Sequence, residues 1–257
     1  MADNTTATAP EPETEDDIPE QEFATFSKGG GMQANVDVLI EKYRAKIDKL
    51  REKVRDFVPQ DDPQYDDVFY LRYVLSYKAK TTKCVEPIRY AVNYRQQYAE
   101  VRQRIHTEGV KAVPHHSVAM RFQCTGMCGS LPTGEPIWVV RTAHSMQSEL
   151  LNSLSREDVA EWMLLSKEVQ YHICDTQTRA TRKLCKMITV IDLQGFSLGK
   201  SDRRFFKVGR VSTLHFGDVS LTVLLSQVLG DSAKQSAKCF PQLLGKTVIV
   251  NAPSFFR

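Results

Sequence analysis

The run FPQLLGKTVIVNAPSFF, at residues 240–256, decides the fold of this chain. It opens with a turn at Pro241 and continues through the β-branched core of residues 247–250, which is too short for a helix. The dipeptide Ala252-Pro253 ends it. Because the run is apolar at alternating and at adjacent positions, it predicts a strand buried on both faces of a sheet that helices cover.

The chain before this run alternates between strand and helix patterns. A second apolar strand, MITVIDL, is predicted at residues 187–193, and the capping-box pattern Ser155-Arg156-Glu157-Asp158 predicts the start of a helix. The turn PTGEP at 132–136 precedes the strand IWVVR at 137–141, and a short strand at 118–124 is expected to pair with it as a hairpin. The alternation predicts an α/β fold with a mixed or parallel sheet flanked by helices, and a further helix is expected near residues 219–229.

Residues 32–109 are expected to form a helical lobe. One helix is predicted over residues 33–57, and two more over 65–77 and 83–105. The first carries a stripe of apolar residues at helical spacing: Val36, Ile40, Tyr43, Ile47, Leu50, Val54 and Phe57. This stripe is expected to dock on the protein's own core, while a protein partner bound through Val36, Ile40, Tyr43, Ile47 and Leu50 stays open.

Charge is distributed unevenly along the 257 residues, which are 42% hydrophobic and carry a net charge of +3. Residues 1–31 carry a net charge of −7 and are predicted to be a disordered acidic tail, so the remainder carries +10. A basic surface of this size suits anionic phospholipid headgroups or nucleic acid, and composition does not choose between them. With no apolar run of membrane-spanning length and no signal-peptide pattern, we expect a cytoplasmic protein.

The six cysteines are dispersed and are predicted to be free thiols. Cys124 and Cys128 form the only close pair in sequence, with His115 and His116 upstream. A second ligand pair at zinc-site spacing is missing, so no metal and no cofactor is expected.

Motifs of enzymatic chemistry are incomplete. The loop GFSLGKS at residues 195–201 has one residue too few for a phosphate-binding loop, and neither Asp192 nor Asn251 has an evident partner for magnesium. The chain contains neither the nucleophile-elbow nor the dinucleotide-binding glycine pattern. His172 lacks a nucleophile at motif spacing and is expected to be a hydrogen-bonded helix residue. We therefore expect no enzyme.

Several large apolar residues fall on elements that would face one another across the sheet: Trp138, Trp162, Leu165, Val169, Ile191 and Val250. Ordinary core packing explains this pattern, and a lipid cavity is the alternative.

From about Tyr65 onward, the chain resembles the CRAL-TRIO lipid-binding family of the phosphatidylinositol/phosphatidylcholine transfer type. The resemblance is carried by YLRYV at 70–74, TGEPIW at 133–138, VIDLQGFS at 190–197, and the stretch from Phe240-Pro241 to Ala252-Pro253, with Gln170-Tyr171 at the family's distance before Asp192. It implies a helical lobe at 32–109 followed by a lipid-binding lobe at 110–257, and an apolar pocket that holds one lipid exchanged at a membrane surface.

The resemblance also implies which residues line the pocket: Trp138, Leu165, Val169, Thr189, Ile191, Gln242 and Tyr77. Family arginines fall on Leu75 and Tyr77, and a family glutamate and arginine fall on Gln242 and Leu243. These replacements remove charge-assisted contacts to a phosphoinositide, so a less polar or differently headed lipid is open. The stretch 198–238 is longer than in the family. The gating helix that follows Asn-Ala-Pro there is missing, so Phe255 and Phe256 are expected to be exposed.

Three hypotheses follow. The first is non-enzymatic binding of a phospholipid or another hydrophobic ligand, with possible transfer between membranes, transient contact with a membrane surface and no nucleic-acid partner. The second is a truncated, lipid-incompetent scaffold that uses the stripe on residues 33–57. The third is a nucleotide hydrolase that depends on Lys200, the least favoured because of the short loop.

Overall fold

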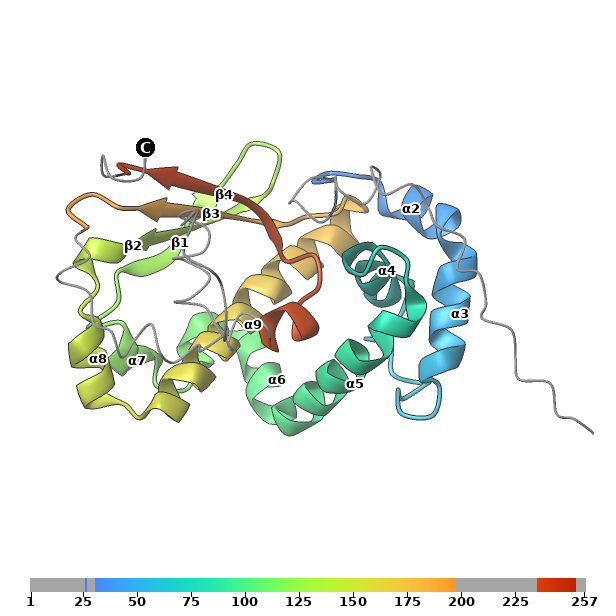
Figure 1. Ribbon diagram of the computed structural model, residues 1–257, viewed down its shortest axis with the longest axis horizontal. Coiled ribbons are helices and arrows are strands. Elements are labelled where there is room, and N and C mark those ends of the chain that lie inside the picture. Colours follow the sequence, from blue (N-terminus) through green and yellow to red (C-terminus); the bar gives the residue numbers. More distant parts are fainter. Residues whose placement is uncertain (1–25, 27–30, 197–234, 253–257) are drawn as a thin grey trace, which may run out of the picture.

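The computed structural model of the chain describes residue 26 and residues 31–196 and 235–252. These residues form a mixed α/β fold in which helices lie against a four-stranded sheet (Figure 1). The helical elements are α2 (Val36–Lys42), α3 (Arg44–Val54), α4 (Asp67–Ser76), α5 (Thr81–Gln97), α6 (Ala99–Glu108), η1 (Gly109–Ala112), α7 (His116–Ala119), η2 (Thr142–His144), α8 (Gln147–Ser153) and α9 (Arg156–Thr181). Most of the predicted acidic tail, the helix expected near 219–229, Lys200, Phe255 and Phe256 lie outside the described residues.

The sheet confirms the predicted α/β alternation. Its strands are β1 (Thr125–Ser130), β2 (Pro136–Arg141), β3 (Met187–Asp192) and β4 (Leu244–Val250), in the order β1-β2-β3-β4. The hairpin β1-β2 is antiparallel, whereas β2, β3 and β4 run parallel. The long connection between β2 and β3 contains α8 and α9, as a crossover between parallel strands requires.

Two predictions about the strands are wrong. β4 is not buried on both faces, because it is the last strand of the described sheet and its residues Lys246 and Thr247 are exposed. Residues 118–124 do not form a strand. The short helix α7 occupies their start, with the Ala119 amide donating to the His115 carbonyl at 2.8 Å, and β1 begins at Thr125 instead. β1 contains Gly126 and Gly129, which give no strand signal of their own.

The predicted long helices are each divided by a tyrosine. α2 and α3 meet at Tyr43, and α5 and α6 meet at Tyr98, where φ is near −105° in both cases. Helical hydrogen bonds continue through Tyr43, whose amide donates to the Leu39 carbonyl at 2.9 Å while its carbonyl accepts from Ile47 at 3.0 Å. The apolar stripe therefore stays on one side of the chain across the break.

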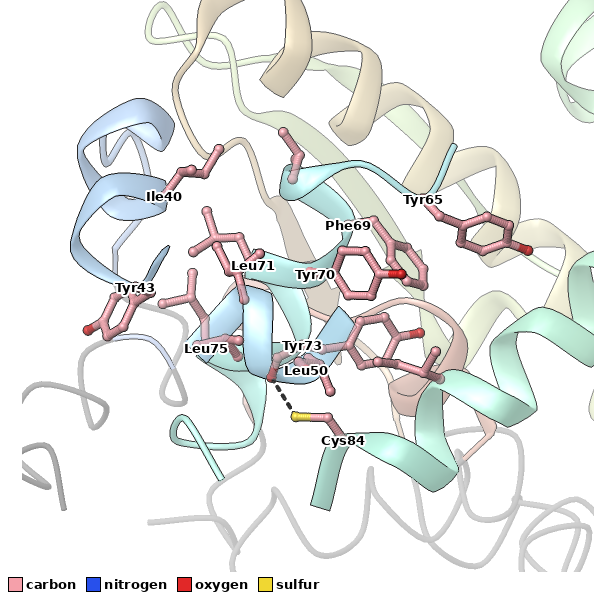
Figure 2. Close-up of a cluster of buried hydrophobic side chains, with 14 of the residues drawn as sticks. Ile40, Tyr43, Leu50, Tyr65, Phe69, Tyr70, Leu71, Tyr73, Leu75 and Cys84 are labelled. Atoms are coloured by element: carbon pink, nitrogen blue, oxygen red, sulfur yellow. Dashed lines mark hydrogen bonds between the residues drawn. The ribbon is translucent and has the colours of Figure 1, made fainter. Parts of the chain in front are cut away.

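That stripe is packed inside the helical lobe. Ile40, Tyr43 and Leu50 are buried together with α4 residues such as Phe69 and Tyr73 (Figure 2). The stripe is thus part of this chain's own core, as expected. It does not present Val36, Ile40, Tyr43, Ile47 and Leu50 as a free face for a partner helix, because each of them is less than a tenth exposed.

A second core lies beneath the sheet. It joins α7, α8 and α9 to Met187 of β3 and to Phe240 and Leu243 of the turn before β4. The division between the two cores falls within α5, which gives Ile88 to the first and Tyr94 to the second. Within the described residues, no helix is both long enough and apolar enough to cross a membrane.

Candidate functional site

The helix α9 is the central element of the second core and starts where the sequence predicts. The Ser155 hydroxyl accepts from the Asp158 amide at 3.0 Å, and the Asp158 carboxylate accepts from the Ser155 amide at 3.2 Å, which completes the capping box. From there α9 runs under the sheet to Thr181 (Figure 1).

One side of α9 is closed by α5 and α6. The buried carboxylate of Glu168 accepts from Tyr94 Oη and Arg102 Nε and contacts His106 Nε2, each at 3.0 Å. Burial alone would raise the pKa of Glu168, but the hydrogen bond from His106 and the charges of Arg102 and Arg95 lower it to about 2. His172 stacks on His106 with ring centres 4.0 Å apart, and burial lowers its pKa. His172 is therefore part of this packing.

The opposite side of α9 faces the sheet. Met163, Gln170 and Gln177 are seven residues apart and share this side. Gln177 Nε2 lies 3.0 Å from the position of a Cβ at Gly134, which places the Gln177 end of this side against the β1-β2 hairpin. Met163 and Gln170 remain half-buried, although Leu164 and Glu168 on other sides of α9 are buried. The sheet side of α9 is thus less tightly covered than the sides that carry Leu164 and Glu168.

A row of paired side chains crosses the strands on the side of the sheet that faces α9. Trp138 pairs with Thr189, and Thr189 pairs with Thr247, across β2, β3 and β4. Met187, Thr189 and Ile191 alternate onto one face of β3, and Met187 belongs to the core that contains α9. Trp138 packs against the same core. Trp138 and Thr189 keep partial exposure, and Ile191 is buried.

We call the surface formed by Met163, Gln170, Trp138, Thr189 and Ile191 the α9–sheet face. Three residues predicted from the resemblance, Trp138, Thr189 and Ile191, belong to it. Leu165 and Val169 come from α9 itself, but Leu165 is 0% exposed and both lie in the packed core. Leu165 is consequently a core residue with no surface for a ligand.

Tyr77 and Gln242 lie elsewhere, where the end of α4 meets the turn before β4. Gln242 Nε2 donates to Ser76 Oγ at 3.0 Å, and Gln242 has a positive φ of 60°. Tyr77 stacks on Tyr73 at 6.4 Å, and burial raises its pKa to about 12. The structure therefore places the predicted lining residues in three settings: the α9–sheet face, the packed core, and the contact between α4 and the turn before β4.

A polar cluster occupies the carboxyl ends of the parallel strands, where sites of α/β proteins are usually found. Asp192 Oδ1 accepts from Asn251 Nδ2 at 2.8 Å, and Asp192 Oδ2 lies 3.4 Å from Arg141 Nε. Arg141 Nη2 is 3.0 Å from His144 Nε2. These contacts, led by the hydrogen bond from Asn251, lower the pKa of Asp192. Each of these side chains thus has a partner within the cluster.

Metal-ligand side chains do not gather in threes anywhere in the described residues. His115 lies 3.4 Å from the Asp158 carboxylate, and Cys128 is exposed on β1. The thiols that do meet are Cys174 of α9 and Cys185 before β3, which share a hydrogen bond. Both are buried and free.

A shallow depression of about 470 Å³ lies in the helical lobe, lined by Asp37, Ile40, Arg44, Arg51, Asp66, Asp67, Val68 and Arg182. Its arginines pair with its own aspartates; Arg44 Nη1, for example, lies 2.7 Å from Asp67 Oδ2. It includes none of the predicted lipid-binding residues. No protein-family model matches the chain.

Proposed function

We propose that this chain is a non-enzymatic lipid-binding protein whose ligand lies against the α9–sheet face. The observation that carries the proposal is the partial exposure of Met163, Gln170, Trp138 and Thr189 between two layers that elsewhere pack into a closed core. Protein interiors are normally close-packed, so side chains beside such a core that still reach solvent offer surface against which a ligand can lie.

The chemistry of this face suits a lipid tail. Trp138, Met163 and Ile191 offer apolar area, while Thr189 and Gln170 offer a few polar groups that could orient a ligand. Acyl chains transferred from water to such a face gain on the order of 25 cal/mol per Å² of apolar area buried. Binding requires no covalent step.

The resemblance to the CRAL-TRIO family from Tyr65 onward supports the same proposal and adds exchange of the lipid at a membrane surface. The basic character of residues 32–257 favours transient, peripheral contact with anionic membranes from the cytoplasm. The scaffold hypothesis loses support because the stripe it would use is buried in the helical lobe. The hydrolase hypothesis rests on Lys200, which lies outside the described residues.

Uptake of a fluorescent phosphatidylcholine from vesicles tests the proposal. The folded protein should acquire the lipid, and Met163→Trp and Gln170→Trp should lower uptake about tenfold because the larger ring fills the space beside the sheet. Thr176→Trp, at an exposed position of α9, should leave uptake unchanged.

Circular dichroism and the midpoint of thermal unfolding establish that each variant is folded. A lipid-transfer protein of known activity provides the positive control for the vesicles. A folded wild-type protein that takes up no lipid would refute the proposal. Unchanged uptake by both filling variants would refute the α9–sheet face as the site.

A further inference from the structure

Two cysteine thiols meet inside the fold, where α9 contacts the segment that leads into β3. Cys174 belongs to α9 and Cys185 lies two residues before β3, and the two residues are 0% and 1% exposed. Their sulfurs share a hydrogen bond, and both thiols are free. The sulfurs of a disulfide are about 2 Å apart, so thiols already in contact need only a small movement to form one.

The hydroxyl of Thr178 connects the main chains of the two cysteines. Its Oγ1 donates to the Cys174 carbonyl at 2.7 Å and accepts from the Cys185 amide at 3.0 Å. Thr178 is itself buried in α9, one turn after Cys174. The position of the segment before β3 is therefore fixed against α9 at the level of the thiols, and their contact does not depend on side-chain rotation alone.

Arg72 adds a positive charge beside this pair. Its Nη2 contacts Asp175 and donates to the Thr178 hydroxyl at 3.0 Å, while its buried Nε and Nη1 have no hydrogen-bond partner among the described residues. A nearby cation favours a thiolate over a thiol. The hydrogen bond between the thiols raises the pKa of Cys174 and lowers that of Cys185, so Cys185 is the one that ionises first.

We propose that Cys174 and Cys185 form a peroxide-sensitive dithiol, which hydrogen peroxide converts into a disulfide between α9 and the segment before β3. The Cys185 sulfur attacks one peroxide oxygen, the O–O bond breaks, and the other oxygen leaves as water with the thiol proton. The resulting sulfenic acid is attacked by the Cys174 sulfur; its S–O bond breaks, and the oxygen leaves as a second water with the Cys174 proton. The thiols lose two electrons and the peroxide gains them.

Peroxide reaches the buried pair through local opening of the chain. Lys183, two residues before Cys185, is exposed, so opening of a few residues is sufficient. The reaction is therefore expected to be slower than that of an exposed thiolate but selective for the pair. It is independent of lipid binding.

Treatment of the folded protein with hydrogen peroxide, followed by alkylation in denaturant and peptide mass analysis, tests the proposal. Trypsin places Cys174 in residues 168–179 and Cys185 in residues 184–186, so their disulfide appears as one linked peptide pair. Cys128→Ser removes an exposed thiol that could crosslink two molecules and provides the background for every sample.

Cys239 is the internal control, because it is also buried and burial raises its pKa to about 12. The linked pair should form about tenfold faster than the Cys239 thiol is lost, since a low thiol pKa speeds the reaction with peroxide. Dithiothreitol should restore both thiols. Loss of all three thiols at equal rates without a linked pair would overturn the proposal, as would a linked pair that forms only in urea.

Two variants test the roles of the sulfurs. Cys174→Ala should accumulate a sulfenic acid on Cys185, which dimedone traps, whereas Cys185→Ala should give no adduct on Cys174. The reverse pattern would overturn the assignment of Cys185 as the attacking thiol. The midpoint of thermal unfolding should rise by several degrees on oxidation of the parent protein and stay unchanged in both variants, because a disulfide restricts the unfolded chain.

Discussion

Glu168 is a single buried carboxylate that connects three helices. Tyr94 of α5 and Arg102 and His106 of α6 all meet its oxygens at 3.0 Å. Because the ionised form receives every one of these contacts, its pKa falls to about 2 against an ordinary value of 4.5. A carboxyl with a depressed pKa stabilises the folded state above its unfolded pKa, and the stabilisation disappears as the pH falls toward the folded pKa.

Glu168→Gln should therefore lower stability at pH 7 by about 3 kcal/mol and flatten the loss of stability between pH 4.5 and 2. Urea unfolding at a series of pH values measures both effects. Glu157→Gln, an exposed position of α9, should match the wild-type curve. If the acid sensitivity of Glu168→Gln were the same as that of the wild-type protein, Glu168 would not be the group that titrates.

At the scale of the element, α9 depends on a local signal at its start and on tertiary contacts along its length. The capping box at Ser155 and Asp158 gives two backbone amides side-chain acceptors within four residues. Beyond it, the helix is covered by α6 on one side and by the sheet on another. The α9–sheet face therefore keeps its geometry only if this helix starts at the correct residue.

Ser155→Ala should reduce the free energy of unfolding by about 1 kcal/mol, because the Asp158 amide loses its side-chain acceptor. Ser155→Asp should stay close to the wild-type value, since an aspartate can cap the same amide. Chemical denaturation measures both variants. An alanine variant as stable as wild type would show that the cap contributes nothing measurable to the free energy of unfolding.

At the scale of the whole molecule, Arg72 links the helical lobe to α9. Its side chain is 0% exposed, Nη2 lies 3.2 Å from Asp175 Oδ1 and donates to Thr178 Oγ1 at 3.0 Å, and its guanidinium is 5.2 Å from the Tyr171 ring centre. Burial would raise the pKa of Asp175, but the charges of Arg72 and Arg179 lower it. The ion pair of Arg72 with Asp175 thus connects the helical lobe to the core that contains α9.

Asp175→Asn should destabilise the protein by about 3 kcal/mol, because it leaves the buried guanidinium of Arg72 without a carboxylate. The double variant Arg72→Met with Asp175→Asn should be more stable than Asp175→Asn alone, since no buried charge is then left unpaired. Denaturant unfolding of the single and double variants measures this coupling. If the destabilisation of the double variant equalled the sum for Arg72→Met and Asp175→Asn, the two residues would not be coupled.

Much of this fold was predictable from sequence signals that lie within a few neighbouring residues. The β-branched runs identify β3 and β4, and Ser155 with Asp158 marks the start of α9, because these signals lie within a few neighbouring residues. β1 was missed because its glycines carry no strand preference and its pairing with β2 defines it. The proposed part of Gln170 in the α9–sheet face was not predicted, because polar residues on a helix usually face water. The one available signal was its seven-residue spacing from Met163 and Gln177.

The order of the sheet also bears on the speed of folding. The hairpin β1-β2 joins neighbours such as Thr125 and Val140, but the parallel pairs β2-β3 and β3-β4 join residues about 50 to 60 positions apart. Closing such loops lowers the entropy of the chain before the stabilising contacts of the sheet have formed, which makes sheets of this kind slow to form. The hairpin can form from local contacts, whereas β4 must wait for β3. The pairing of β4 with β3 is therefore expected to follow the hairpin, and the threonine and isoleucine side chains of β4 stay in solvent until that pairing forms.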